Sequence, residues 1–138
     1  MKIFVDTSAW IALADKRDVN HSVAAAIYDR IRDRAELLTS NFVFDETLTW
    51  IRYRLNHSLA VSVGQKMRQS RLLTIVRVDA EVEAAGWEIF KEYADQKFSF
   101  TDCTSFALMR KHRVRKAFAF DSDFTTMRFQ LVLPNRSK

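Results

Sequence analysis

Hydrophobic residues along the chain fall into five short runs separated by longer amphipathic stretches. The runs are rich in β-branched and aromatic residues, which predicts strands. The predicted strands are Lys2–Val5, Leu37–Ser40, Leu73–Val78, Ala117–Phe120 and Phe129–Leu133. Between them, apolar residues recur every three or four positions, which predicts helices. The predicted helices are Ser8–Lys16, His21–Arg34, Phe42–Leu55, Leu59–Ser70, a helix capped by Asp79 and reaching Tyr93, and Thr101–Lys111.

Strands that alternate with helices indicate βαβ units and therefore a parallel sheet with right-handed crossovers. Two of the runs, Ile3–Val5 and Ala117–Phe120, show no apolar–polar alternation, as expected for strands buried on both faces. We therefore expect an α/β fold, a three-layer α/β/α sandwich with a mostly parallel sheet of about five strands. A length of 138 residues predicts a single domain over residues 1–138.

Charge and cysteine content narrow the classes of function. The net charge of +5 favours a polyanionic partner, although a basic protein without such a partner is an equal alternative on charge alone. The longest apolar run, Ala9–Ala14, is too short to cross a bilayer, and Asp6 interrupts any signal peptide. A lone cysteine, Cys103, fits a reducing compartment. We expect a cytoplasmic protein that does not enter membranes.

Glycine and histidine are too sparse for several kinds of site. Neither Gly64 nor Gly86 lies in a glycine-rich phosphate-binding motif. The three histidines stand apart from one another and from the cysteine, which argues against zinc. Candidate chemistry therefore rests on carboxylates.

Four acidic residues fall where a parallel sheet would gather them. Asp6 and Asp121 directly follow the first and fourth predicted strands. Glu46 lies in the first turns of the helix after the second strand, and Asp102 begins the helix before the fourth. Sites in such sheets form beyond the carboxyl ends of the strands. If strands one and four are neighbours, all four side chains meet at one rim.

Each acid also has a purely structural interpretation. Asp102 follows Ser99 by three residues and fits a capping box. Asp121 or Asp123 could cap a short turn, and Glu46 could be solvated, with Asp45 taking its place. Gathered within about 5 Å, however, ionised carboxylates repel by roughly 3 kcal/mol per pair at an effective dielectric near 20. They would share protons or bind a hard cation such as Mg²⁺ or Mn²⁺.

The order and spacing of these motifs resemble the PIN-domain family, and within it the VapC-type toxin ribonucleases. The segments that carry the resemblance are Val5–Ser8, Asp45–Thr47, Phe100–Asp102 and Phe120–Phe124. The resemblance implies the strand order 3-2-1-4-5. It also implies a catalytic and metal-binding quartet formed by Asp6, Glu46, Asp102 and Asp121. Asp123 would be a further metal ligand, and the hydroxyls of Thr7 and Ser8 would support the site.

The resemblance further implies a function and partners. The chain is expected to be a Mg²⁺- or Mn²⁺-dependent endoribonuclease, the toxin of a type II toxin–antitoxin module, often a homodimer and silenced by a cognate antitoxin. Glu46 would hold a second ion or accept the proton of the attacking water, and the sequence leaves both roles open. Two alternatives remain open, namely a DNA nuclease and a non-catalytic RNA- or partner-binding domain of the same fold.

Other residues receive weaker interpretations. Arg52, Arg54 and Arg128 are candidate RNA contacts. The basic residues between Arg110 and Lys116 end the Asp102 helix and are expected at the opposite rim. We assign the Trp10 and Trp50 side chains to core packing rather than to base stacking, and Cys103 to a buried thiol rather than a nucleophile.

Overall fold

The computed structural model describes residues 1–135, so the last three residues of the predicted domain range lie outside the described part. The strands are β1 (Lys2–Val5), β2 (Glu36–Ser40), β3 (Leu73–Val76), β4 (Lys116–Phe118) and β5 (Gln130–Leu131). The helices are α1 (Thr7–Ala14), α2 (His21–Ile31), α3 (Asn41–Arg54), α4 (His57–Gln69), α5 (Ala80–Glu92), α6 (Phe100–Lys111) and α7 (Asp123–Thr126). In this described range, no helix combines the length and apolar character needed to cross a membrane.

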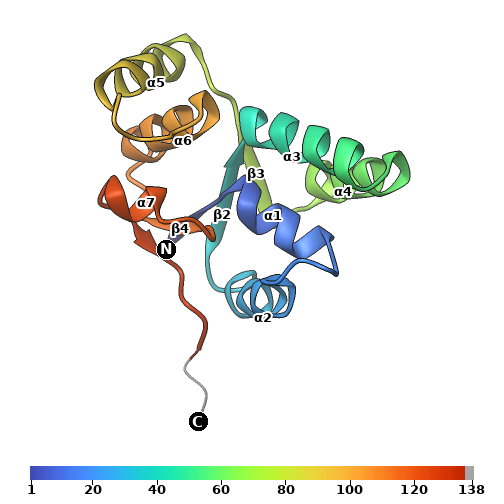
Figure 1. Ribbon diagram of the computed structural model, residues 1–138. Coiled ribbons are helices and arrows are strands. Elements are labelled where there is room, and N and C mark those ends of the chain that lie inside the picture. The colour runs from blue at the N-terminus through green and yellow to red at the C-terminus, as the bar shows by residue number, and fades with distance from the viewer. Residues whose placement is uncertain (136–138) are drawn as a thin grey trace.

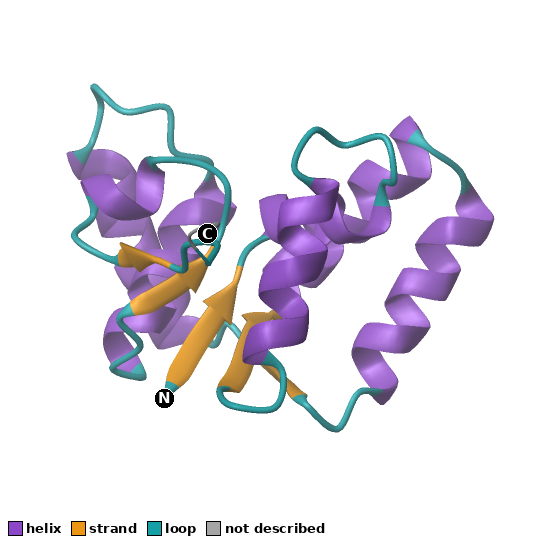
Figure 2. Cartoon of the chain, turned by 90° about the horizontal axis from the view of Figure 1, so that it is seen from below, coloured by secondary structure: helices purple, strands orange, loops and turns teal. Residues whose placement is uncertain are grey.

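All five strands run parallel in the order β3-β2-β1-β4-β5, which confirms the expected fold class and strand order. In Figure 1, α5 and α6 lie on one side of the sheet and α1 to α4 on the other. Figure 2 shows the strands side by side between these two groups of helices. Because the strands are parallel, their carboxyl ends share one edge, and α1 and α3 leave the sheet from that edge.

The central strand is buried on both faces, which explains why its sequence lacks alternation. Ile3, Phe4 and Val5 are each at most 1% exposed. On one side, α6 brings Phe106 against Phe124, with ring centroids 5.1 Å apart in an edge-to-face arrangement. This packing holds the middle of α6 against α7, which follows β4.

Three predicted strands end earlier than expected. In two of them, a backbone amide near the predicted end donates to a side chain outside the sheet, and the third strand has only a short neighbour to pair with. The Val78 amide donates to the Asn41 side chain at 2.7 Å, so β3 ends at Val76. The Phe120 amide donates to the Ser8 hydroxyl at 3.0 Å, so β4 ends at Phe118. The edge strand β5 has only this short neighbour, and the short helix α7 before it was not predicted.

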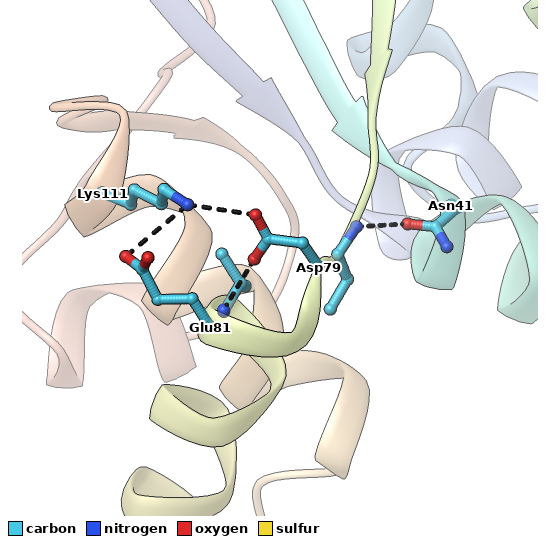
Figure 3. A network of polar contacts seen from close by, with 6 residues as sticks. Asn41, Asp79, Glu81 and Lys111 are labelled. Carbon is cyan, nitrogen blue, oxygen red and sulfur yellow. Dashed lines mark hydrogen bonds and ion pairs between the residues drawn. The ribbon is translucent and has the colours of Figure 1, made fainter.

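A polar network holds the connection from β3 into α5 (Figure 3). Asp79 caps α5 by accepting a hydrogen bond from the Val82 amide at 2.9 Å. The Lys111 ammonium, at the end of α6, lies 3.1 Å from Asp79 and 3.6 Å from Glu81. The network therefore fixes the start of α5 beside the end of α6, so the two helices pack antiparallel.

Close packing between α5 and α6 depends on Gly86, and this gives a testable prediction. A Cβ at Gly86 would lie 3.0 Å from Thr104 Cγ2 and 3.1 Å from the Thr104 backbone. Gly86→Ala should therefore push α5 away from α6 and lower the free energy of unfolding by ~1–3 kcal/mol in urea denaturation. This loss should outweigh the ~1 kcal/mol that alanine usually gains over glycine in a helix.

Gly64 in α4 is the matched control for this substitution. Its nearest neighbours are the methyl ends of Leu48, at 3.1 and 3.4 Å, which belong to a flexible side chain. Gly64→Ala should thus be neutral or stabilising by up to ~1 kcal/mol. Equal effects of the two substitutions would contradict the tight α5–α6 contact.

Candidate active site

Asp6 occupies the carboxyl end of β1 and begins α1 as its N-cap. One carboxylate oxygen, Oδ2, accepts hydrogen bonds from the Ser8 hydroxyl at 2.7 Å and the Ser8 amide at 3.2 Å. The side chain is only 3% exposed, and its other oxygen, Oδ1, has no hydrogen-bond partner in the described part of the chain. A buried carboxylate needs a proton shared with a neighbour or a cation to offset its burial, and a hydrogen bond between Asp6 and Asp121, which lowers the pKa of Asp121, shows that these two carboxyls lie within reach of one another.

Ser8 connects the ends of the two central strands. Its hydroxyl donates to Asp6 and accepts a hydrogen bond from the Phe120 amide, while the Asp6 amide donates to the Phe118 carbonyl at 3.0 Å. These contacts place Asp6 and the segment after β4 at one edge, as the sequence predicts. Of the two predicted supporting hydroxyls, Ser8 contacts Asp6, whereas the Thr7 hydroxyl is buried without a well-formed partner.

Burial and mutual repulsion raise the pKa values of the two acids at the ends of β1 and β4. Burial, followed by the charges of Asp121 and Asp102, raises the pKa of Asp6 to about 7, against the lowering effect of Ser8. Burial and the charges of Asp123 and Asp102 raise the pKa of Asp121 to about 6. Carboxyls that perturb one another in this way lie close together.

Asp102 and Glu46 complete the rim from two helices. Burial raises the pKa of Asp102, and the charge of Asp123 adds to the increase. Burial also raises the pKa of Glu46, with contributions from Asp102 and Asp45, while the nearby Thr7 hydroxyl lowers it. Asp45 itself is exposed, so Glu46 is the member of this pair that faces the rim.

The structural interpretation of Asp102 is also correct. Its Oδ2 accepts the Ser99 amide at 2.9 Å while its own amide donates to the Ser99 hydroxyl at 3.0 Å, forming the predicted capping box of α6. Capping places this carboxyl at the end of α6 that faces the rim. One oxygen serves the cap, which leaves the other for a further interaction.

The candidate ligands suit a hard cation in kind, although their side chains do not form a closed coordination sphere. All the donors are carboxylate oxygens, which Mg²⁺ and Mn²⁺ prefer. Across residues 1–135, however, no three acidic, histidine or cysteine side chains converge tightly enough to hold an ion as they stand. Asp102 Oδ2 is bonded to Ser99, and Asp121 Oδ1 accepts the Asp123 amide at 3.0 Å.

The structure also places the candidate RNA contacts and the basic segment around His112. Arg52 and Arg54 are exposed in the last turn of α3, and Arg128 is exposed after α7 with a left-handed backbone (φ 68°). Lys2, at the amino end of β1, donates to the His112 carbonyl at 3.4 Å, so the basic segment around His112 lies at the opposite rim, as predicted.

The predicted placements of Trp10 and Cys103 are confirmed, whereas that of Trp50 is wrong. Trp10 is 7% exposed and belongs to the core, as expected. The core assignment of Trp50 is wrong, because its ring is only partly buried and is covered by the exposed Arg54. Cys103 is fully buried, and burial with the charge of Asp102 raises the pKa of its thiol to about 11, so burial and pKa both favour the predicted buried thiol over a nucleophile.

A parallel α/β sheet of this strand order, with carboxylates gathered at its carboxyl edge, places the chain in the class of α/β nucleases. The family model described as "PIN domain" matches residues 3–130, and the chain belongs to this family.

Similar proteins support the same class. The chain is 37% identical over 132 residues to the 23S rRNA-specific endonuclease VapC20 of Mycobacterium tuberculosis, covering 96% of this chain and 98% of that protein. It is 30% identical over 128 residues to a VapC ribonuclease of Archaeoglobus fulgidus, covering 91% and 80% respectively. The comparisons confirm the predicted family and the predicted class of enzyme, a nuclease.

Solved structures agree with the fold. The crystal structure of Mycobacterium tuberculosis VapC20, a Sarcin-Ricin loop cleaving toxin, matches with a TM-score of 0.89 and 36% identity, covering 96% of this chain and 99% of that one. VapBC2 from Rickettsia felis, bound to a promoter DNA fragment, matches with a TM-score of 0.74 but only 12% identity, and so shows the fold alone. It covers 98% of this chain and all of the other.

Proposed function

We propose that this chain is a Mg²⁺- or Mn²⁺-dependent endoribonuclease that cleaves the sarcin–ricin loop of 23S rRNA. The observation that carries the proposal is the buried Asp6 carboxyl, whose pKa is raised by burial and by the charges of Asp121 and Asp102 at the carboxyl edge of β1 and β4. The substrate is proposed from the similarity to VapC20, which extends over nearly the whole of both chains.

In this proposal the acidic rim holds the ion through Asp6, Asp102 and Asp121, with Asp123 as a possible further ligand. A bound divalent ion would activate water, orient the phosphodiester and stabilise charge on the attacked phosphate. Ser8 keeps the Asp6 carboxyl oriented through its 2.7 Å hydrogen bond. Glu46, with a raised pKa, is suited to accept a proton from the attacking water or to hold a second ion.

We further propose that the chain works as one nuclease domain in the cytoplasm, as a homodimer and as the toxin partner of a cognate antitoxin. The toxin role is supported by the similarity to VapC20, which is a Sarcin-Ricin loop cleaving toxin, and the homodimer, the antitoxin and the location are proposed from the resemblance to the VapC group. An antitoxin that covers the carboxylate rim would keep RNA out.

Cleavage of ribosomal RNA tests the proposal directly. Purified protein is incubated with intact ribosomes, with isolated 23S rRNA and with a DNA copy of the sarcin–ricin loop, in Mg²⁺, Mn²⁺ or EDTA. We expect one dominant cut in the RNA loop, with a 5′-phosphate and a 3′-hydroxyl, if water attacks phosphorus opposite the 3′ oxygen, so that the P–O3′ bond breaks and the 3′ oxygen leaves with a proton. EDTA should abolish it.

Each other outcome has a distinct meaning. Cleavage at many unrelated RNA positions would overturn the proposed substrate but not the chemistry. Preferential cleavage of the DNA copy would favour the DNA-nuclease alternative. Full activity in EDTA would eliminate the metal-dependent mechanism.

A further inference from the structure

We propose that the RNA strand runs from the carboxylate rim along the seam between α1 and α3 to a cationic cavity at the far ends of these helices. There Lys16, Arg17 and Arg54 would bind a backbone phosphate, and Trp50 would stack on a base between the cavity and the rim. This inference rests on the proposed ribonuclease function and extends it to the path of the substrate.

The two helices form a parallel pair that leads away from the rim. At one end, Thr7 of α1 lies close enough to Glu46 of α3 to affect its pKa. At the other end, Ala14–Arg17 and Arg54 line the same cavity. The two helices are in contact and lie near one another in Figure 1. Both paths, Thr7 to Asp15 and Glu46 to Arg54, span eight residue-to-residue steps, or about 12 Å at 1.5 Å per step.

The cavity has the charge that a phosphate requires. Its volume is ≈ 460 Å³, and its cationic lining residues Lys16, Arg17 and Arg54 are all exposed. Within residues 1–135, none of the three forms an ion pair, although Asp15 also lines the cavity. The Asp15 carboxylate instead accepts the Arg17 amide at 3.0 Å. Three cations against the single Asp15 carboxylate leave the opening with a net positive charge, which is suited to a polyanion.

Between the rim and the cavity, α3 presents a surface for a base. Glu46, Trp50 and Arg54 are spaced four residues apart and so lie along one side of the helix. The Arg54 guanidinium lies over the Trp50 ring, 5.7 Å from its centroid. Nucleobases stack on tryptophan rings and on arginine planes without requiring a particular sequence. The pair therefore resembles a stacking platform rather than a piece of core.

The distances agree with the dimensions of an RNA strand. At about 3.4 Å per nucleotide in a stacked strand, 12 Å corresponds to roughly three nucleotides. A phosphate held in the cavity would therefore lie about three nucleotides from the one at the carboxylates. Such a second anchor fixes which phosphodiester reaches the acidic rim, and so contributes to the choice of cleavage site.

The test measures RNA binding separately from cleavage. Fluorescence anisotropy in EDTA follows a fluorescein-labelled 12-nucleotide single-stranded RNA at several salt concentrations. For Arg54→Gln and for the double variant Lys16→Gln/Arg17→Gln, the slope of log K against log salt should fall by ~0.7 per lost phosphate contact. Trp50→Ala should weaken binding roughly 5- to 150-fold. Thermal denaturation checks that each variant is folded.

Arg115→Gln is the matched control, because it removes an exposed cation near the start of β4, at the opposite rim. Its salt slope should equal that of the unsubstituted protein. Slopes that fall equally in all variants would overturn the proposal, as would a probe that fails to bind the unsubstituted protein at low salt. The variants at the cavity could also keep their RNA affinity but lose affinity for an oligoglutamate peptide. This result would overturn the proposal, because the cavity would then bind an acidic protein segment.

Failure here can be separated from failure of the proposed function. Lowered salt slopes in a protein that cleaves no RNA would leave this binding site standing without the nuclease activity. Metal-dependent cleavage with unchanged slopes would leave the nuclease standing and remove the cavity from the substrate path.

Discussion

Asp6→Asn is expected to reduce RNA cleavage at least about 100-fold while leaving the protein folded. Loss of groups that only support a metal ligand typically costs 10- to 100-fold, so loss of a ligand charge should cost at least as much. The asparagine oxygen can still accept the Ser8 hydrogen bonds, which keeps the start of α1 in place. The measurement is the initial rate of cleavage in Mg²⁺.

The same substitution should stabilise the metal-free protein at neutral and alkaline pH. The Asp6 carboxyl keeps its proton up to about pH 7 in the folded chain but loses it near 3.8 when unfolded. Between these values the folded state binds more protons, so the stability of the unsubstituted protein falls as pH rises. A difference of one in pKa is worth about 1.4 kcal/mol, so the penalty reaches at most ~4 kcal/mol. The neutral asparagine side chain removes this stability penalty.

Asp45→Asn is the matched control for both effects. Asp45 is exposed on α3 next to Glu46, so its neutralisation changes the net charge equally, and its charge is the smallest of the contributions that raise the pKa of Glu46. Its cleavage rate should stay within a few-fold of the unsubstituted protein, and its stability should hardly change. A fully active Asp6→Asn protein, or an inactive Asp45→Asn protein, would contradict the placement of the active site.

Addition of Mg²⁺ or Mn²⁺ should raise the melting temperature by about 10 °C once the ion reaches a hundred times its dissociation constant. Mass action at that concentration contributes ~2.7 kcal/mol. For a domain of this size, each kcal/mol moves the melting temperature by about 4 °C. The increase arises because the ion replaces repulsion among the carboxylates, including the unpartnered Asp6 oxygen, with attraction.

This stabilisation should depend on pH in a defined direction. Ligands bind metal in their deprotonated form, so the ion competes with the protons that Asp121 and Asp6 hold up to about pH 6 and 7. The increase in melting temperature should be small at pH 5 and largest near pH 8. Differential scanning fluorimetry with EDTA as the reference measures it. An equal increase in Asp6→Asn, or one independent of pH, would place the ion elsewhere.

Several features of the candidate site follow from the chain order of local patterns. The run Ile3–Val5 is apolar throughout, which indicates a strand buried on both faces, and Asp6 immediately follows it. The Ser99–Asp102 spacing predicts the capping box that the structure shows. Such patterns are informative because strand burial and helix capping depend on residues only a few positions apart.

Other features depend on contacts between distant parts of the chain. Ser8 meets the Phe120 amide 112 residues away, and this bond ends β4 earlier than its apolar sequence suggests. Trp50 looks like a core residue in sequence, but its ring lies half-exposed beneath Arg54. Neither the hydrophobicity of a residue nor its helical spacing reports which neighbouring element covers it.

The sequence by itself determined the kinds of element, their order and the identity of the acids at the ends of buried strands. Its resemblance to a family supplied the strand order, which periodicity cannot provide. Only the tertiary structure decided that Asp6 is buried among other carboxyls, and that the far ends of α1 and α3 line one cationic cavity. The physical reason is range, because local patterns act over a few residues, whereas burial and charge at the rim are set by side chains from four separate segments.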